Sequence, residues 1–115
     1  MAHANVEACF LLWRKQLNNQ DFMLLLGMAH KTRDHDLLDD NGDVIQMARH
    51  WFGGRDSLCE ILNLKPTKGN YINITKRLAN LKTLGAIEQI ATGKPGTNSE
   101  YVLSGIVPQL PKGLN

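Results

Sequence analysis

The sequence has few cysteines and no long apolar run, and each of these shortages excludes a class of protein. Its net charge is also small, at +2. Its two cysteines, Cys9 and Cys59, are far apart and have apolar neighbours. Their spacing matches neither a zinc motif nor a redox pair, so we expect free buried thiols in a reducing compartment, the cytoplasm. No apolar run approaches the roughly 18 residues needed to cross a membrane, and the first residues lack the pattern of a signal peptide. We therefore expect no membrane partner.

Motifs for catalysis, phosphate binding and metal binding are also missing. Gly53 and Gly54 lack the following Lys-Ser/Thr of a phosphate-binding loop. Ser57 and Cys59 have no strand–turn–helix elbow around them. The acidic stretch 30–43 does not fit a calcium loop, because the first and last ligand positions would be leucine and alanine. We expect no enzyme, no cofactor, no metal site and no small-molecule effector.

What is present is the composition of one globular domain with an uneven charge. The chain has 115 residues, of which 43% are hydrophobic and 21% are charged, enough for a modest core without metal or disulfide bonds. Residues 1–54 carry five Lys/Arg against seven Asp/Glu, whereas residues 55–98 carry seven against three. A polyanionic partner would therefore meet the second half of the chain.

Apolar periodicity predicts the order of the secondary structure. The predicted helices cover 5–17, 20–31, 55–64 and 70–84, and the predicted strands cover 86–91 and 99–105. Gly85 is the expected C-cap of the last helix. Residues 32–43 fit a charged loop with an Asn-Gly turn, and 44–52 fit a strand or a helix. The two strands are joined by a loop at 92–98 and predict a hairpin.

The helix predicted over 70–84 has two different sides. Its core side gathers four residues at helical spacing: Tyr71, Ile74, Leu78 and Leu81. Its other side is a polar stripe of Asn73, Lys76, Arg77 and Asn80, with no acid between 69 and 86. Lys and Arg can neutralise phosphates or donate to guanine, and Asn can bond adenine at two atoms. The stripe therefore suits DNA, with an ordinary solvated helix face as the alternative.

The order of these elements resembles a winged helix–turn–helix domain over residues 55–104. The resemblance rests on two segments and a loop: Leu58-Cys59-Glu60-Ile61-Leu62-Asn63-Leu64, Leu81-Lys82-Thr83-Leu84-Gly85-Ala86-Ile87-Glu88, and the Gly-Lys-Pro-Gly tip within 92–98. It implies an α+β, mostly helical fold with three core helices, a C-terminal β-hairpin wing and an extra N-terminal helix. The domain boundaries that follow are 1–18 for the N-terminal helix, 19–105 for the winged helix–turn–helix domain and 106–115 for a tail.

The resemblance also implies sequence-specific binding of double-stranded DNA. A recognition helix over about 70–84 would enter the major groove, and a basic wing at 92–98 would reach phosphate or the minor groove. The residues expected to contact DNA are Thr67, Lys68, Asn70, Asn73, Lys76, Arg77, Asn80, Lys94, Thr97 and Asn98. The turn at 65–70 is longer than is usual in the family, so the start of the recognition helix stays open.

The expected role is that of a transcriptional regulator or of a plasmid or phage replication or partition protein. We expect a homodimer, with an apolar stripe on the first helix as the candidate interface: Val6, Phe10, Trp13 and Leu17. Burial of this stripe within its own domain is the alternative. The alternative function is a winged-helix protein–protein interaction module that does not bind DNA.

Overall fold

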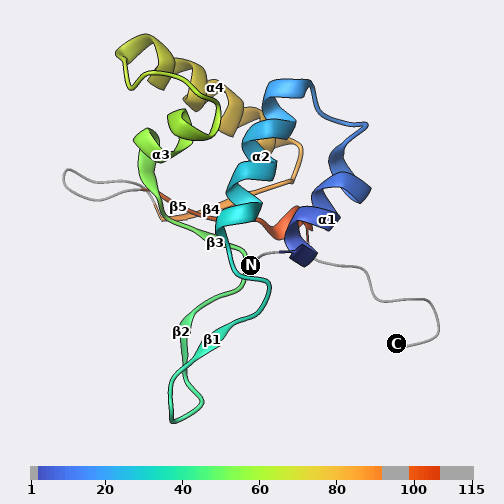
Figure 1. Cartoon of the computed structure of the whole chain (residues 1–115), viewed down its shortest axis with the longest axis vertical. Helices are drawn as coiled ribbons and strands as arrows, with labels where there is room; N and C mark the ends of the chain where they lie inside the picture. Colours follow the sequence, from blue (N-terminus) through green and yellow to red (C-terminus); the bar gives the residue numbers. More distant parts are fainter. Residues whose placement is uncertain (1–2, 92–98, 107–115) are drawn as a thin grey trace.

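A computed structural model describes residues 3–91 and 99–106, which contain four α-helices and two small antiparallel sheets (Figure 1). The elements are α1 (His3–Trp13), α2 (Asn19–Lys31), β1 (Leu37–Leu38), β2 (Val44–Gln46), β3 (His50–Trp51), α3 (Gly54–Ile61), α4 (Lys68–Thr83), β4 (Glu88–Ala91), β5 (Glu100–Val102) and the 3-10 helix η1 (Ser104–Ile106). The α+β class predicted from the sequence is confirmed for these residues. None of their helices is both long and apolar enough to cross a membrane.

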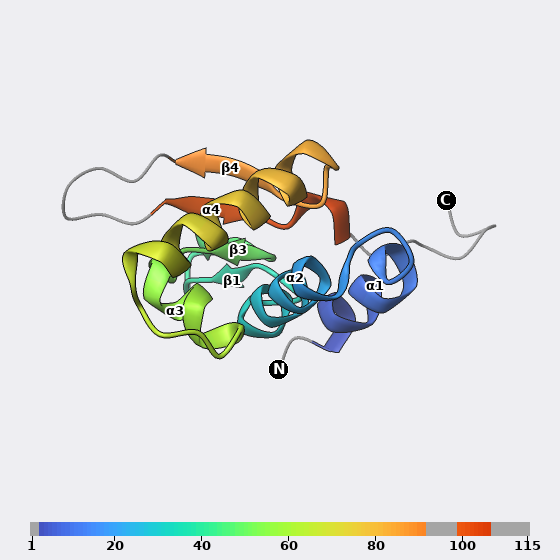
Figure 2. The same ribbon diagram turned by 90° about the horizontal axis from the view of Figure 1, so that it is seen from above.

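The larger sheet has three antiparallel strands in the order β3-β5-β4. Val102 of β5 lies in register between His50 of β3 and Glu88 of β4. Helices α2, α3 and α4 lie on one side of this sheet, and the β1–β2 hairpin extends away on the other side (Figures 1 and 2). Residues 44–52, which fitted a strand or a helix, are thus divided between two strands in different sheets.

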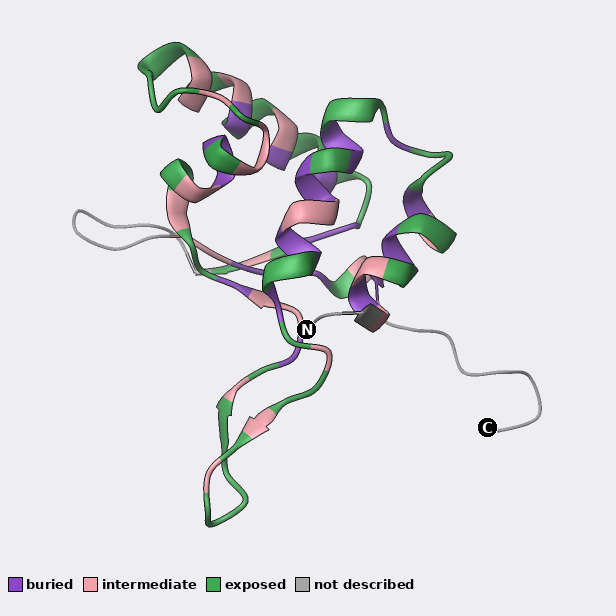
Figure 3. Ribbon diagram, in the orientation of Figure 1, coloured by how far each residue is buried: buried purple, intermediate pink, exposed green. Residues whose placement is uncertain are grey.

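The core lies between α2 and the elements around it, and buried residues follow the inward sides of the helices (Figure 3). Four residues of α2, namely Leu24, Leu25, Met28 and Ala29, are fully buried. Helix α1 packs on α2 and on η1. The indole N–H of Trp13 donates to the carbonyl oxygen of Gly105 at 3.0 Å, which joins the end of α1 to η1.

The segment 32–43, predicted as a charged loop, contains β1 and the turn of the β1–β2 hairpin. Its tip is a turn in which the Gly42 N–H donates to the Asp39 carbonyl at 3.1 Å. The Asp39 carboxylate accepts from the backbone N–H groups of Asn41 and Asp43 at 2.8 and 2.9 Å, as Asp does when it stabilises a turn. The predicted Asn-Gly turn is confirmed. The flanking strands, two and three residues long, are too short to give an alternating pattern.

Both cysteines are buried, Cys9 at 0% exposure and Cys59 at 1%. Burial raises the pKa of the Cys9 thiol to about 12 and also raises the pKa of Cys59, because the thiolate would lose its hydration. The Cys9 thiol therefore stays protonated from pH 7 to pH 9, and the Cys59 thiol keeps its proton to a higher pH than an ordinary cysteine does. We expect neither to react with a thiol reagent such as Ellman's reagent in the native protein, and both to react in denaturant. A native thiol that reacts as fast as free cysteine would contradict this burial.

Candidate nucleic-acid interface

The connection between α3 and α4 begins with a tight helix end. Asn63 adopts a left-handed conformation with φ of 56°. Its N–H donates to the Glu60 carbonyl at 3.0 Å, and the Leu64 N–H donates to the Cys59 carbonyl at 2.9 Å. This pair of bonds is the Schellman arrangement, in which Asn is the commonest substitute for glycine. The backbone therefore reverses within two residues of the end of α3.

Helix α4 begins at Lys68, two residues before the predicted start at about 70. Thr67 is its N-cap, and the Thr67 hydroxyl accepts from the Asn70 N–H at 3.3 Å. The Asn70 side-chain amide donates to the Lys65 carbonyl at 2.8 Å, which fastens the first turn of the helix to the connection. The sequence left this start open, and the structure gives it: Thr67 caps the helix, so Gly69 and Asn70 continue it instead of forming a turn. Thr67 and Asn70 thus have structural roles here.

The core side and the C-terminus of α4 agree with the predictions. Ile74, Leu78 and Leu81 are buried, at 0%, 7% and 0% exposure. Gly85 has φ of +85°, a conformation that glycine adopts without strain. Its N–H donates to the Lys82 carbonyl at 3.1 Å, which completes the predicted C-cap. Helix α4 is therefore fixed along one side and at both ends.

Two residues of the predicted polar stripe, Arg77 and Asn80, contact α2. A guanidinium nitrogen of Arg77 lies 3.0 Å from the Asp21 carboxylate, and the Asn80 amide donates to the same carboxylate at 3.4 Å. Asp21 is 3% exposed and also receives a hydrogen bond from the side-chain amide of Asn18. A buried carboxylate needs such partners because it has lost its water. Arg77 and Asn80 consequently hold α4 against α2.

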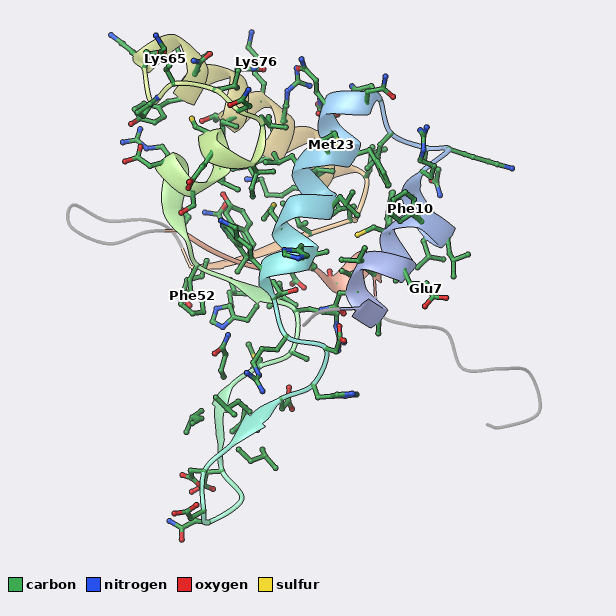
Figure 4. The ribbon with its side chains drawn as sticks, viewed as in Figure 1. Glu7, Phe10, Met23, Phe52, Lys65 and Lys76 are labelled. Carbon is green, nitrogen blue, oxygen red and sulfur yellow. The ribbon has the colours of Figure 1, made fainter. Side chains whose placement is uncertain are left out.

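Three exposed residues of α4 form a row that we call the outer row: Lys68, Ile72 and Lys76. All three are exposed, Ile72 at 52%, and they follow one another at intervals of four residues along the helix. Lys76 points away from the body of the protein, as does Lys65 in the preceding connection (Figure 4). Asn73, beside this row, is partly buried. Ile72 and Lys65 were not among the predicted contacts.

A second group at the α3–α4 junction combines an aromatic ring with a cation. The Arg55 guanidinium lies over the Tyr71 ring, 4.4 Å from its centroid. The Tyr71 hydroxyl donates to the Asp56 carboxylate. This bond raises the pKa of Tyr71, since the phenol must keep its proton to donate. Tyr71 was predicted as a core residue, and its ring is only partly buried.

The remaining predicted contacts divide into two groups. Lys68, Asn73 and Lys76 lie on the outward or lateral sides of α4. The predicted wing residues Lys94, Thr97 and Asn98 lie outside the residues that the structure describes. Within the described ranges, no three His, Cys, Asp or Glu side chains come together in an arrangement that could hold a metal ion.

The apolar stripe proposed as a dimer interface on α1 is only partly available. Trp13 and Leu17 are each 8% exposed and belong to the core of their own chain, which was the alternative reading. Val6 is partly buried, and Phe10 is 49% exposed with its ring edge-on to Phe22. A dimer would therefore need a different main contact surface.

Chemically, the outer row of α4 offers two ammonium groups with an apolar side chain between them. Such a surface can neutralise phosphates and can pack on a methyl group. No protein-family model, curated protein sequence or solved structure matches the chain.

Proposed function

We propose that the chain binds double-stranded DNA as a winged helix–turn–helix protein, with α4 as the recognition helix. Its role would be that of a transcriptional regulator or of a plasmid or phage replication or partition protein. The observation that carries this proposal is the outer row of α4: two lysines and an exposed isoleucine on a helix whose other side is fixed to the core.

The arrangement of the elements supports the proposal. A winged helix–turn–helix domain needs three helices followed by a hairpin that lies beside the third helix. Here α2, α3 and α4 come in that order, and β4 and β5 follow α4 and pair with β3 in the order β3-β5-β4. Residues 92–98 between β4 and β5 would supply the wing. β4 follows α4 directly through the turn at Gly85, and in Figure 1 the β4–β5 pair lies below α4.

The chemistry of the outer row supports major-groove binding in particular. Lys76 lies two residues after the buried Ile74, about 200° around the helix, so it is directed away from the core. Lys76 would contact guanine or phosphate, Ile72 would pack on a thymine methyl group, and Lys68 would contact the backbone. Ile72 is apolar and 52% exposed between the two lysines, which suits contact with a thymine methyl group flanked by phosphates.

The test is the affinity of the purified chain for duplexes selected from a random pool, measured as a function of salt. Lys76→Ala should weaken binding to the selected duplex by ~1–3 kcal/mol if Lys76 reads a base. Lys68→Ala should weaken binding to all duplexes alike and reduce the salt slope by about 1, because one phosphate contact is lost. Fluorescence anisotropy with labelled duplexes measures both quantities.

Lys15→Ala is the matched control. It removes the same charge from an exposed position between α1 and α2, so its effect should be limited to the small change in net charge. Equal effects of Lys15→Ala and Lys76→Ala would show that only overall charge matters. If no duplex is retained by the chain at low salt, the DNA-binding proposal is wrong and the protein-interaction module becomes the better description.

A further inference from the structure

The β1–β2 hairpin and its base, residues 36–48, form an arm that projects from the body on the side of the sheet opposite the helices (Figure 1). It carries four large apolar side chains that are exposed: Leu38 at 53%, Val44 at 50%, Ile45 at 61% and Met47 at 43%. Figure 3 shows the arm as mainly exposed or intermediate, with no buried layer behind its strands. A two-stranded hairpin alone is only marginally stable in water, so this arm is expected to be covered by something.

The base of the arm is fixed in place. The Ala48 N–H donates to the Asp36 carboxylate at 2.8 Å, and the Arg49 N–H donates to the Arg33 carbonyl at 2.8 Å. Arg49 also adopts φ of 59°, a left-handed conformation that turns the chain from the arm into β3. The arm is therefore presented in a defined direction by its own base.

The charge of the arm limits what can cover it. Residues 36–48 contain four aspartates and no lysine or arginine. DNA and anionic membranes would be repelled by such a segment. The partner must instead offer an apolar surface with positive charge at one end.

The same chain has such a surface along the outer side of α2. Two adjoining hollows of about 380 and 270 Å³ share Met23 and Ile61 and run between α1, α2 and α3. Leu26 contributes to the apolar floor, and His30 and Lys31 lie at one end. None of the described residues that line the two hollows is acidic. We call this surface the α2 groove.

We propose that two copies of the chain form a dimer in which the arm of each lies in the α2 groove of the other. The arm does not reach its own groove, because it extends away from the helices that line it (Figure 1). Reciprocal exchange covers both surfaces at once, as a two-fold symmetric interface requires. Ile45 packs against Met23 and Leu26 of the second copy, and the aspartates of the tip lie near its Lys31.

Sedimentation equilibrium of the full chain without DNA tests this interface. The wild-type chain should show a monomer–dimer equilibrium below about 1 mM. Ile45→Asp in the arm and Met23→Lys in the groove should each raise the dimer dissociation constant at least about tenfold, because each places a charge in an apolar contact. Leu11→Asp is the matched control: Leu11 is 76% exposed on α1, outside the arm and the groove, and its substitution should leave the dissociation constant unchanged.

A charge exchange tests which surfaces meet. Asp40→Lys and Lys31→Glu should each weaken the dimer, and the double variant should recover most of the loss.

Deletion of the arm is a further test. Because Leu37 and Gln46 are paired across the hairpin, residues 37–46 can be replaced by a short Gly-Ser turn, and this armless chain should be folded and monomeric. Three results would overturn the proposal. These are a wild-type chain that is monomeric throughout, a dimer that persists without the arm, and a double variant that dimerises no better than the two single variants. These results do not depend on DNA binding, so either proposal can fail alone.

Discussion

Arg77→Ala is expected to lower the free energy of unfolding by about 3–5 kcal/mol, because it leaves the buried carboxylate of Asp21 without its cation. Asp21 is 3% exposed, and its remaining side-chain partners, Asn18 and Asn80, are neutral amides. A loss of this size is a large part of the roughly 5–15 kcal/mol that usually stabilises a domain. Urea unfolding followed by the fluorescence of the two buried tryptophans, Trp13 and Trp51, measures it.

Two variants distinguish the loss of the ion pair from a general effect on α4. Lys76→Ala, one residue earlier and exposed, should change the free energy of unfolding by no more than about 0.5 kcal/mol. The double variant Asp21→Leu, Arg77→Met removes both charges, and it should recover most of the stability lost in Arg77→Ala. If Arg77→Ala unfolds at the same urea concentration as Lys76→Ala, the ion pair does not hold α4 against α2.

This contact also decides which residue can test DNA binding. A helix that has lost its anchor to α2 would present its outer row poorly whether or not Arg77 touches DNA. Loss of binding in Arg77→Ala would therefore have two explanations. Lys76 has no such structural role in the described part of the chain, so its substitution reports on the proposed interface alone.

Much of α4 could be predicted because its determinants are local in sequence. The spacing of Ile74, Leu78 and Leu81 fixes the buried side, and Gly85 alone supplies the left-handed residue that ends the helix. The strands β4 and β5 were predicted for the same reason, since Tyr101 and Leu103 alternate with more exposed neighbours. Periodicity and capping act over a few residues, and both can be read without the fold.

The contacts that were missed join distant parts of the chain. Asp21 and Arg77 are 56 residues apart, and nothing in the sequence pairs them. One signal was available: Arg77 lies three residues after Ile74 and four before Leu81, so it borders the buried side of the helix and was poorly placed for a groove contact. The arm was missed because two- and three-residue strands leave no periodic pattern.

Gly105 of η1 contacts both α1 and the turn that follows α4. Its N–H donates to the Ala86 carbonyl at 3.0 Å, and its carbonyl accepts from the Trp13 indole. A β-carbon at this position would lie 2.5 Å from the Gly85 carbonyl oxygen and 2.7 Å from the Ala86 α-carbon. Both are backbone atoms, which cannot rotate away as a side chain would. Only glycine therefore fits between η1 and the Gly85 turn.

Gly105→Ala is accordingly expected to lower the free energy of unfolding by about 3 kcal/mol, the upper part of the usual range for overpacking. Gly69→Ala is the matched control, because no atom from beyond its chain neighbours and its own helix backbone lies within 4 Å of its added β-carbon. In the first turn of α4 alanine should be neutral or should raise the free energy of unfolding by up to about 1 kcal/mol. Urea unfolding of the two variants measures the difference. Equal stabilities would mean that η1 does not pack on the end of α4 as closely as these distances require.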